Sequence, residues 1–242
     1  MTKVVPNANS LASKKEQVSE MFDNISPKYD LLNRVLSMGI DISWRKKVVK
    51  LLKKENPQSI LDVATGTADL AIALTKTGAN LITGVDISAG MLEVGRKKVL
   101  DKGLDQKIIL QIEDAENLSF RDNTFDAVTV SFGVRNFENL EKGLSELFRV
   151  LKPGGKLVIL EFSQPTKFPF NKLYQFYFKN VLPLIGKMVS RNASAYTYLP
   201  ASVSAFPYGK NFETILQRTG FIETQWKELT LGIATIYWGS KK

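Results

Sequence analysis

The chain has 242 residues, a length and a hydrophobic content of 44% that are typical of one soluble α/β domain with an appended segment. It contains neither cysteine nor histidine, which excludes disulfides, thiolate or histidine metal sites and histidine bases, so any proton transfer must use carboxylates, lysine, tyrosine or water. The net charge of +9 favours nucleic acid, an anionic membrane surface or an acidic substrate as a partner, although lysines that only maintain solubility explain it equally well.

The first segment, residues 1–57, is predicted to be an all-helical preface. Its opening stretch, MTKVVPNANSLASKK, has no signal-peptide core, and no apolar run in the chain is long enough to span a bilayer, so we expect a cytoplasmic protein. Ser13 opens a capping-box pattern at the start of a first helix. A second helix is expected from Ser26, and a third from about Ser43 until Pro57 ends it.

Residues 58–162 have a different pattern and are predicted to form the core. Short β-branched runs alternate with helical stretches, which indicates an α/β fold with a doubly wound, Rossmann-like parallel sheet. The runs are continuously apolar, as in strands that are buried on both faces. The expected strands are 59–64, 80–87, 107–114, 125–132 and 155–162, and the expected helical stretches are 68–76, 89–103 and 139–155.

The last third of the chain interrupts this alternation and then completes it. Residues 163–210 are rich in aromatic side chains, and we expect them to form a helical insertion that acts as a lid. Residues 211–242 are expected to return to the core as a helix over 212–220 and two strands, 221–230 and 231–242, with a turn at or just before Gly232.

The stretch LDVATGTADL, residues 61–70, reads as a strand that enters a tight turn and then a helix. A dinucleotide fingerprint needs three glycines, but here only Gly66 is present and Ala64 and Ala68 occupy the flanking positions. Asp86 ends the second strand 20 positions after Gly66, which suits a carboxylate that accepts ribose hydroxyls. The alternative is that Asp86 only caps the next helix and Gly66 only makes a turn.

Two further strand ends carry polar or small residues. Asp114 and Ala115 follow the third strand, where a carboxylate can accept from an adenine amino group and a small neighbour leaves space for the ring. Ser131 ends the fourth strand. Each feature alone has a structural explanation, such as capping by Asp114, but their order along the chain is specific.

These motifs carry a resemblance to a known family. Residues 61–162 resemble a class I S-adenosylmethionine-dependent methyltransferase. Nearly the whole chain after residue 13 is similar to the quinone-ring C-methyltransferases of menaquinone and ubiquinone biosynthesis, in the motifs MFDNISPKYDLLNRVLSMGIDISWRKK, GVDISAGML, FGVRNFEN, LKPGGKLVILEFSQP and YTYLPASVSAFP.

The resemblance implies a seven-stranded sheet with the last strand antiparallel, and S-adenosylmethionine as the cofactor. It also implies the roles of the cofactor-binding residues: Thr65 and Gly66 in the first loop, Asp86 on the ribose, Asp114 and Ala115 beside adenine, and Ser131 beside the methionine part. No metal ligands are implied.

In this family the acceptor is a ring carbon of a reduced quinone, which reacts best when the neighbouring phenol is ionised. Because an ordinary phenol has a pKa of about 10, the site must lower that pKa or supply a base. We interpret Arg135 and Asn136, which follow the fourth strand, as the groups that stabilise the phenolate or hold a water. The alternative for Arg135 is an ion pair with a carboxylate such as Glu138.

Tyr29 is the third catalytic candidate, because the resemblance puts the preface helix over the pocket. Its alternative is a half-buried tyrosine of the core. Asp30 and Asp41 are weaker candidates for a base, with capping as the expected role.

The implied substrate carries an isoprenoid tail, and the preface together with the insertion is expected to form an apolar cover for it. The aromatic residues behind this expectation are Phe168, Phe170, Tyr174, Phe176, Tyr177 and Phe178. A homodimer interface or ordinary packing explains them equally well. The lysines indicate peripheral contact with anionic lipid.

No nucleic-acid partner is expected, because the fourth strand ends in SFGVRNF without an Asn-Pro pair. Between the two quinols of the family, the sequence analysis favours demethylmenaquinol and leaves the ubiquinone precursor, or another small aromatic acceptor, open.

Overall fold

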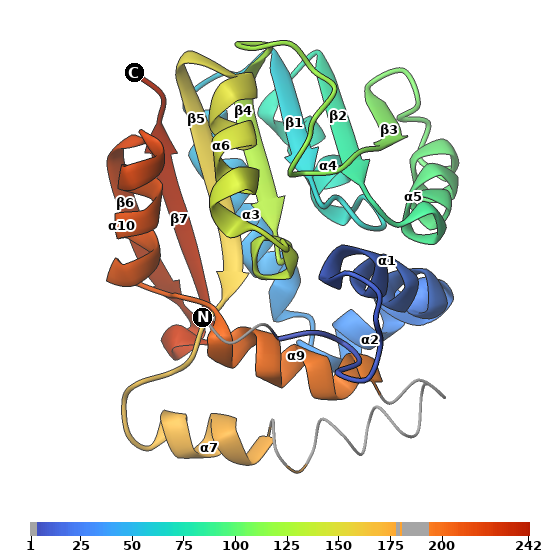
Figure 1. Ribbon diagram of the computed structural model, residues 1–242. Coiled ribbons are helices and arrows are strands. Elements are labelled where there is room, and N and C mark those ends of the chain that lie inside the picture. Colours follow the sequence, from blue (N-terminus) through green and yellow to red (C-terminus); the bar gives the residue numbers. More distant parts are fainter. Residues whose placement is uncertain (1–3, 178–179, 181–193) are drawn as a thin grey trace.

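The computed structural model describes residues 4–177, 180 and 194–242 of the chain. A seven-stranded sheet crosses the molecule. Helices lie on both of its faces, and further helices lie below the carboxyl ends of its parallel strands (Figure 1). Its strands are β1 (Ser59–Val63), β2 (Leu81–Asp86), β3 (Ile108–Ile112), β4 (Phe125–Ser131), β5 (Leu151–Phe162), β6 (Ile222–Leu229) and β7 (Ala234–Ser240).

The strand order is β3-β2-β1-β4-β5-β7-β6. Only β7 is antiparallel to its neighbours, and the other pairs are parallel. The expected α/β fold and its antiparallel last strand are therefore confirmed. Because the chain progresses from β1 toward β3 on one side and from β4 toward β5 on the other, the topological switch lies between β1 and β4.

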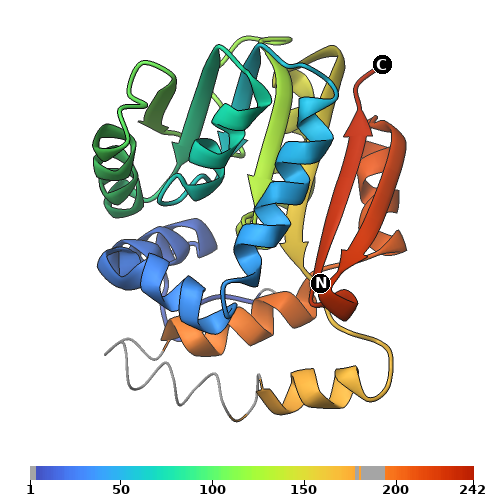
Figure 2. The same cartoon turned by 180° about the vertical axis from the view of Figure 1, so that it is seen from behind.

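The two faces of the sheet have separate apolar layers. Helices α3 (Ile40–Lys53), α4 (Asp69–Leu74) and α5 (Ala89–Asp101) contribute apolar side chains to one layer, with Trp44 and Leu74 among its buried members. Helices α6 (Leu140–Val150) and α10 (Lys210–Thr219) contribute to the other, in which Leu147 and Phe212 are fully buried. Figure 2 shows α3 on the face opposite to α6 and α10. Strands covered on both sides explain the continuous apolar runs of the sequence.

The carboxyl ends of the parallel strands face a group of helices from distant parts of the chain (Figure 1). The preface contributes α1 (Lys14–Ile25), the short helix η1 (Ser26–Lys28) and α2 (Tyr29–Leu36), while the insertion contributes α7 (Phe170–Phe176) and α9 (Ser194–Ala205). Val18 and Met21 of α1 pack against Tyr198 of α9, so the two segments form one cover.

The expected start of the third helix was wrong by about one turn. Helix α3 begins at Ile40 instead of Ser43, because Gly39 adopts a left-handed conformation (φ +76°) that ends the preceding turn. The aromatic residue Phe178 and residues 181–193 of the expected insertion lie outside the described residues. Within the described part, no helix combines the length and the apolar character that crossing a membrane requires.

Candidate functional site

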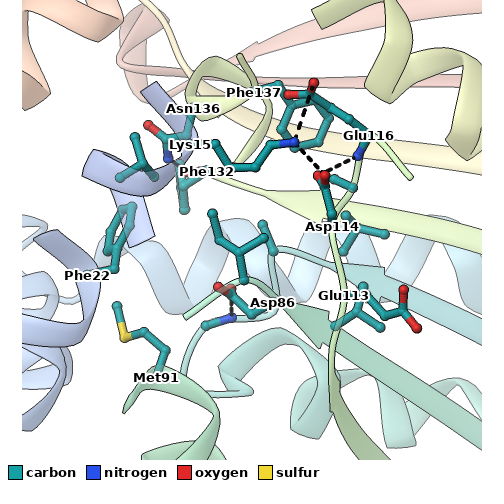
Figure 3. Close-up of a pocket in the computed structure, with 18 of the residues that line it drawn as sticks. Lys15, Phe22, Asp86, Met91, Glu113, Asp114, Glu116, Phe132, Asn136 and Phe137 are labelled. Carbon is teal, nitrogen blue, oxygen red and sulfur yellow. Dashed lines mark hydrogen bonds and ion pairs between the residues drawn. The ribbon is translucent and has the colours of Figure 1, made fainter. Parts of the chain in front are cut away.

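A first cavity, of about 70 Å³, lies at the carboxyl ends of β1, β2 and β4, at the topological switch (Figure 3). Doubly wound sheets bind ligands at this point. Five of the six predicted cofactor residues line it, and Thr65 does not. The lining residues of this set are Gly66, Asp86, Asp114, Ala115 and Ser131.

Gly66 and Asp86 are joined directly. The Gly66 N–H donates to Asp86 Oδ2 at 2.8 Å, and the Ser88 N–H donates to Asp86 Oδ1 at 2.9 Å. Burial raises the pKa of the Asp86 carboxyl above its ordinary value, and these backbone donors oppose the rise. The Ile87 backbone also contributes a hydrogen bond. Since a carboxylate can accept about four hydrogen bonds, Asp86 retains acceptor capacity for a ligand in the cavity. Asp86 thus both fixes the loop and faces the cavity.

The turn after β1 adopts the glycine conformation although it contains alanines. Ala64 (φ +53°) and Ala68 (φ +64°) are both left-handed, as is Gly66 (φ +56°). Such a conformation costs an alanine about 1–2 kcal/mol. A Cβ added to Gly133 would lie 2.5 Å from the Ala64 Cβ, so this glycine lets the loop after β4 approach the loop after β1. Strained backbone of this kind is concentrated at functional sites.

Asp114 is engaged by both its own loop and helix α1. Its Oδ1 accepts from the Glu116 N–H at 2.9 Å, and its Oδ2 pairs with the Lys15 ammonium at 2.5 Å. The hydrogen bond to Asp114 raises the pKa of Lys15. Figure 3 shows the Lys15 side chain reaching across the cavity to this carboxylate. Asp114, which the resemblance implies as the partner of adenine, is thus paired with Lys15 of the preface.

Thr65 points away from the cavity. Its hydroxyl donates to Asp62 Oδ2 at 2.7 Å, and the Thr129 hydroxyl donates to Asp62 Oδ1 at 2.6 Å. Asp62 is buried, and desolvation raises its pKa to about 6. Asp62 is a functional candidate that no sequence motif marked; the only signal is a carboxylate near the end of an otherwise apolar strand.

A second cavity, of about 410 Å³, lies under the cover formed by the preface and the insertion. Most of its lining is apolar, with contributions from α1, α2, α3, α7 and α9. Phe22, Tyr29 and Phe132 line both cavities, so the two spaces adjoin at these three side chains. A cavity at the switch point with several charged side chains in its lining thus meets a larger, mostly apolar one.

Arg135 and Asn136 are neighbours on the short helix η3 (Val134–Asn136) but face different cavities. Asn136 lines the first cavity, and its Oδ1 accepts from the Tyr198 hydroxyl at 3.2 Å. Arg135 lines the second. Consecutive residues of one turn therefore place an amide on the cofactor side and a guanidinium on the apolar side.

The partner of Arg135 is the fully buried Glu161 of β5, at 2.7 Å, and not Glu138 as the alternative had it. The Arg135 side chain is only 7% exposed, and its Cζ lies 5.4 Å from the centre of the Phe162 ring. Its Nε is buried and has no hydrogen-bond partner among the described residues. A buried, unpaired donor is costly, so an acceptor is expected from a ligand in the second cavity.

The remaining candidates of the preface are also placed. Tyr29 lines both cavities, and burial raises its pKa, which keeps the hydroxyl protonated at neutral pH. Asp30 accepts from Thr67 Oγ1 at 2.6 Å and pairs with Lys98 at 2.8 Å. Asp41 pairs with Arg45. The Asp30 pair therefore joins the preface to the core, whereas the Asp41 pair lies within α3 of the preface, and neither aspartate shows the expected capping role.

The family model described as the ubiE/COQ5 methyltransferase family matches residues 10–241. The chain belongs to the ubiE/COQ5 methyltransferase family. It is 51% identical over 240 residues to the demethylmenaquinone methyltransferase of Bacteroides fragilis, covering 99% of this chain and 98% of that protein. It is 48% identical to the ubiquinone/menaquinone biosynthesis C-methyltransferase UbiE of Geotalea daltonii, covering 96% and 99%. As a member of this family, the chain is a methyltransferase that depends on S-adenosylmethionine.

Solved structures support the fold of this ubiE/COQ5 family member. An S-adenosylmethionine-dependent methyltransferase from Thermotoga maritima matches with a TM-score of 0.64 at 20% identity, covering 92% of this chain and 99% of that one. The [4+2]-cyclase SpnF matches with a TM-score of 0.67 at 16% identity, covering 96% and 97%. Since a cyclase shares the fold, the reaction has to be argued from the site.

Proposed function

We propose that this ubiE/COQ5 family member transfers a methyl group to a ring carbon of a demethylated prenyl quinol, with demethylmenaquinol as the acceptor. The observation that carries the proposal is the junction of two unlike cavities at Phe22, Tyr29 and Phe132. One has carboxylates for a polar cofactor, and the other has mostly apolar walls and the buried Arg135 Nε, which has no partner in the described residues. The name of the relative from Bacteroides fragilis supports the choice of quinol.

The residues of the first cavity fit S-adenosylmethionine. A Cβ built on Gly66 would meet nothing within 4 Å, so the loop leaves open space beside the Asp86 carboxylate. Asp86 would hold the ribose hydroxyls, Asp114 and Ala115 the adenine, and Ser131 and Asn136 the methionine end. Thr65 would act indirectly, through its bond to Asp62 behind the loop. When bound, S-adenosylmethionine supplies an electrophilic methyl group on a positively charged sulfur.

Arg135 and Tyr29 would act on the acceptor. The unpaired Nε of Arg135 can donate to the acceptor oxygen, which favours the phenolate and lowers the phenol pKa by a unit or more. Ionisation raises the electron density on the neighbouring ring carbon. Tyr29, at the junction, can donate to the same oxygen because its own pKa is raised and the hydroxyl keeps its proton. The apolar walls exclude water and hold the ring in position for in-line transfer.

The second candidate acceptor is the benzoquinol precursor of ubiquinone. The name of the relative from Geotalea daltonii, which includes both quinones, supports it. Both rings offer a phenol oxygen beside the reacting carbon, so the same role of Arg135 applies to each.

The tail of such a quinol would leave the second cavity through an apolar mouth. Met38, Phe170, Leu173 and Leu231 line this cavity and are also exposed, with Met38 79% and Leu231 58% accessible. Met38 (φ +49°) and Leu231 (φ +59°) both hold left-handed conformations, which cost a side chain of this size about 1–3 kcal/mol. Because this strained backbone holds apolar side chains in solvent, we infer that these side chains contact an apolar partner outside the protein.

We propose that this mouth contacts the bilayer in which the tail resides, on the cytoplasmic side. Residues 1–57 and 163–210 would then be the cover that admits the tail, around the methyl-transfer core of 58–162 and 211–242. A second copy of the chain is the competing occupant of the mouth, as in a homodimer. The net charge of +9 favours anionic lipid over another strongly basic chain.

The test is an assay with labelled S-adenosylmethionine and both demethylated quinols. Arg135→Ala should keep cofactor affinity, measured by calorimetry with S-adenosylhomocysteine, but lose at least tenfold in kcat, roughly the value of one charge-assisted hydrogen bond. Asp86→Asn should instead weaken cofactor binding. If the wild-type enzyme methylates neither quinol, the proposal is wrong; normal turnover of Arg135→Ala would refute the role of that residue.

A further inference from the structure

Glu161 is a buried carboxylate that the proposed reaction does not use directly. It lies on β5, in the stretch LVILEF, and its side chain is 0% exposed. It does not line either cavity. A carboxylate that is removed from water needs a strong partner, and this one has Arg135.

The contacts of Glu161 fix Arg135 from two sides. Its Oε1 accepts from Arg135 Nη1 at 2.7 Å and from the Phe162 N–H at 2.8 Å, while its Oε2 accepts from the Arg135 backbone N–H at 3.3 Å. Nη1 also donates to the Phe132 carbonyl. The guanidinium is thereby held next to the Phe162 ring. Its Nε is buried and remains without a partner in the described residues.

The same contacts also limit the charge that Arg135 can offer. In a dry environment, a guanidinium 2.7 Å from a carboxylate forms a nearly neutral pair. An acceptor oxygen beside Nε therefore shares the positive charge with Glu161. A second anion next to this pair is less favoured than beside a lone guanidinium, so Glu161 restrains the ionisation of a bound phenol while it fixes the donor.

We infer that Glu161 is the positioning residue of the acceptor site, which orients the Arg135 guanidinium toward the acceptor oxygen and sets how much of its charge reaches that oxygen. The inference rests on the proposed function, since it concerns the same cavity.

In the described part of the chain, the titratable groups near this pair include several tyrosines, Lys14, whose ammonium donates to the Arg135 carbonyl at 3.0 Å, and Asp41 and Arg45, which line the cavity and pair with each other. Tyr29, Tyr174 and Tyr198 interact with Arg135, and Tyr198 and Tyr237 interact with Glu161. Burial raises the pKa of each of these tyrosines, to about 12 for Tyr198 and Tyr237. The same is true of Tyr177, which also lines the cavity. Between pH 6 and 9 these tyrosines stay protonated, so they do not contribute to a titration of the acceptor phenol in that range.

The experiment compares Glu161→Gln with the wild-type enzyme. Glutamine retains an oxygen for the two short hydrogen bonds but removes the negative charge. The matched control is Glu213→Gln, which changes a buried carboxylate that pairs with Lys210 on α10 and lines neither cavity. The first readout is the pKa of 4-nitrophenol bound to each protein, followed by the absorbance of the phenolate. The second is the dependence of kcat on pH with the quinol.

In Glu161→Gln we expect the pKa of bound 4-nitrophenol to fall by about one unit relative to wild type, since it gains the full charge of Arg135. The acidic limb of the kcat profile should move to lower pH by a similar amount, and the Kd for S-adenosylhomocysteine should not change. Both shifts should vanish when Arg135→Ala is added, because the effect passes through Arg135. Glu213→Gln should match wild type.

An unchanged pKa of the bound probe in Glu161→Gln would overturn the inference. Should this variant fail to fold, Glu161→Asp retracts the carboxylate by one methylene and is expected to lower kcat roughly tenfold with cofactor affinity intact; a kcat equal to wild type would equally overturn it. If the probe responds but neither quinol is methylated, the proposed acceptor is wrong and Glu161 retains its role. If quinol is methylated and the probe does not respond, the proposed acceptor is correct and the inference about Glu161 is wrong.

Discussion

The buried carboxyl groups around the switch point have different surroundings, and we expect them to have different roles. Asp62 is buried between two threonine hydroxyls, Asp86 accepts from backbone N–H groups at the edge of a cavity, and Glu161 faces a guanidinium. Desolvation raises the pKa of all three, but only Glu161 has a cation as its direct partner. We therefore propose that Asp62 supports the loop, that Asp86 binds the cofactor and that Glu161 acts on the acceptor side.

Asp62 should make stability depend on pH. Its pKa is about 6 in the folded chain, against an ordinary value of 3.8, so between these two pH values the folded state retains a proton that the unfolded state has released. Stability then decreases as pH rises through this range and is constant above it. Across the range, this group contributes a change of about 3 kcal/mol, at about 1.4 kcal/mol per pKa unit.

The substitution Asp62→Asn removes that titration, and the threonine hydroxyls can still pair with the amide. Urea unfolding at pH 4.5 and pH 7.5 measures the free energy of unfolding of both proteins. We expect the free energy of unfolding of Asp62→Asn, relative to that of the wild type, to be higher at pH 7.5 than at pH 4.5. An equal difference between the two proteins at both pH values would contradict the prediction.

At the scale of elements, helix α1 closes the first cavity through several polar anchors. Lys15 reaches Asp114, Ser19 donates to the Ile87 carbonyl at 3.2 Å, and Asp23 accepts from the Ser88 hydroxyl at 2.6 Å. With these contacts formed, the free volume of about 70 Å³ has room for only a few water molecules. Because the Lys15–Asp114 pair reaches across the cavity, we expect it to open when a cofactor enters.

Lys15→Ala should speed cofactor entry. The ion pair is about one-third exposed at each partner, so its contribution is at most about 1 kcal/mol, and we expect the association rate of S-adenosylhomocysteine to rise up to about fivefold. Stopped-flow fluorescence measures this rate. Because salt screens such a pair, high salt should accelerate binding to the wild type and not to the variant. Lys102→Ala, at the exposed end of α5, is the control; equal rates for all three proteins would count against the anchor.

The sequence predicted the elements of the fold but not the contacts between them. The strands followed from apolar runs, because burial on both faces leaves a pattern within each segment. The pairing of Arg135 with Glu161 is set by the neighbouring positions of β4 and β5 in the sheet. That register brings together residues 26 apart in the chain, and Glu161 appears in the sequence as one polar residue in an apolar run. The sequence therefore predicted the position of Arg135 but not its partner.

For the molecule as a whole, the second cavity has an apolar mouth on the side where the preface and the insertion meet. An isolated exposed leucine such as Leu100 needs no explanation, but Met38, Phe170, Leu173 and Leu231 are exposed and line the same cavity. The carboxyl ends of the strands, both cavities and this mouth follow one another from the sheet outward. Such an order suits an enzyme that takes a lipid substrate from a bilayer while it binds a polar cofactor from water.

Sedimentation with vesicles that contain phosphatidylglycerol tests this arrangement. We expect the wild type to bind at low salt and to lose binding at high salt, because its net charge of +9 attracts anionic lipid. Met38→Asn with Leu231→Asn should weaken binding at low salt at least tenfold, since each apolar side chain inserted contributes on the order of 1–2 kcal/mol, and asparagine tolerates the left-handed conformation. Leu100→Asn, an equally exposed leucine on α5, should bind as the wild type does. Wild-type protein that fails to sediment at either salt concentration, or that forms a dimer which the double variant dissolves, would show that the mouth does not contact lipid.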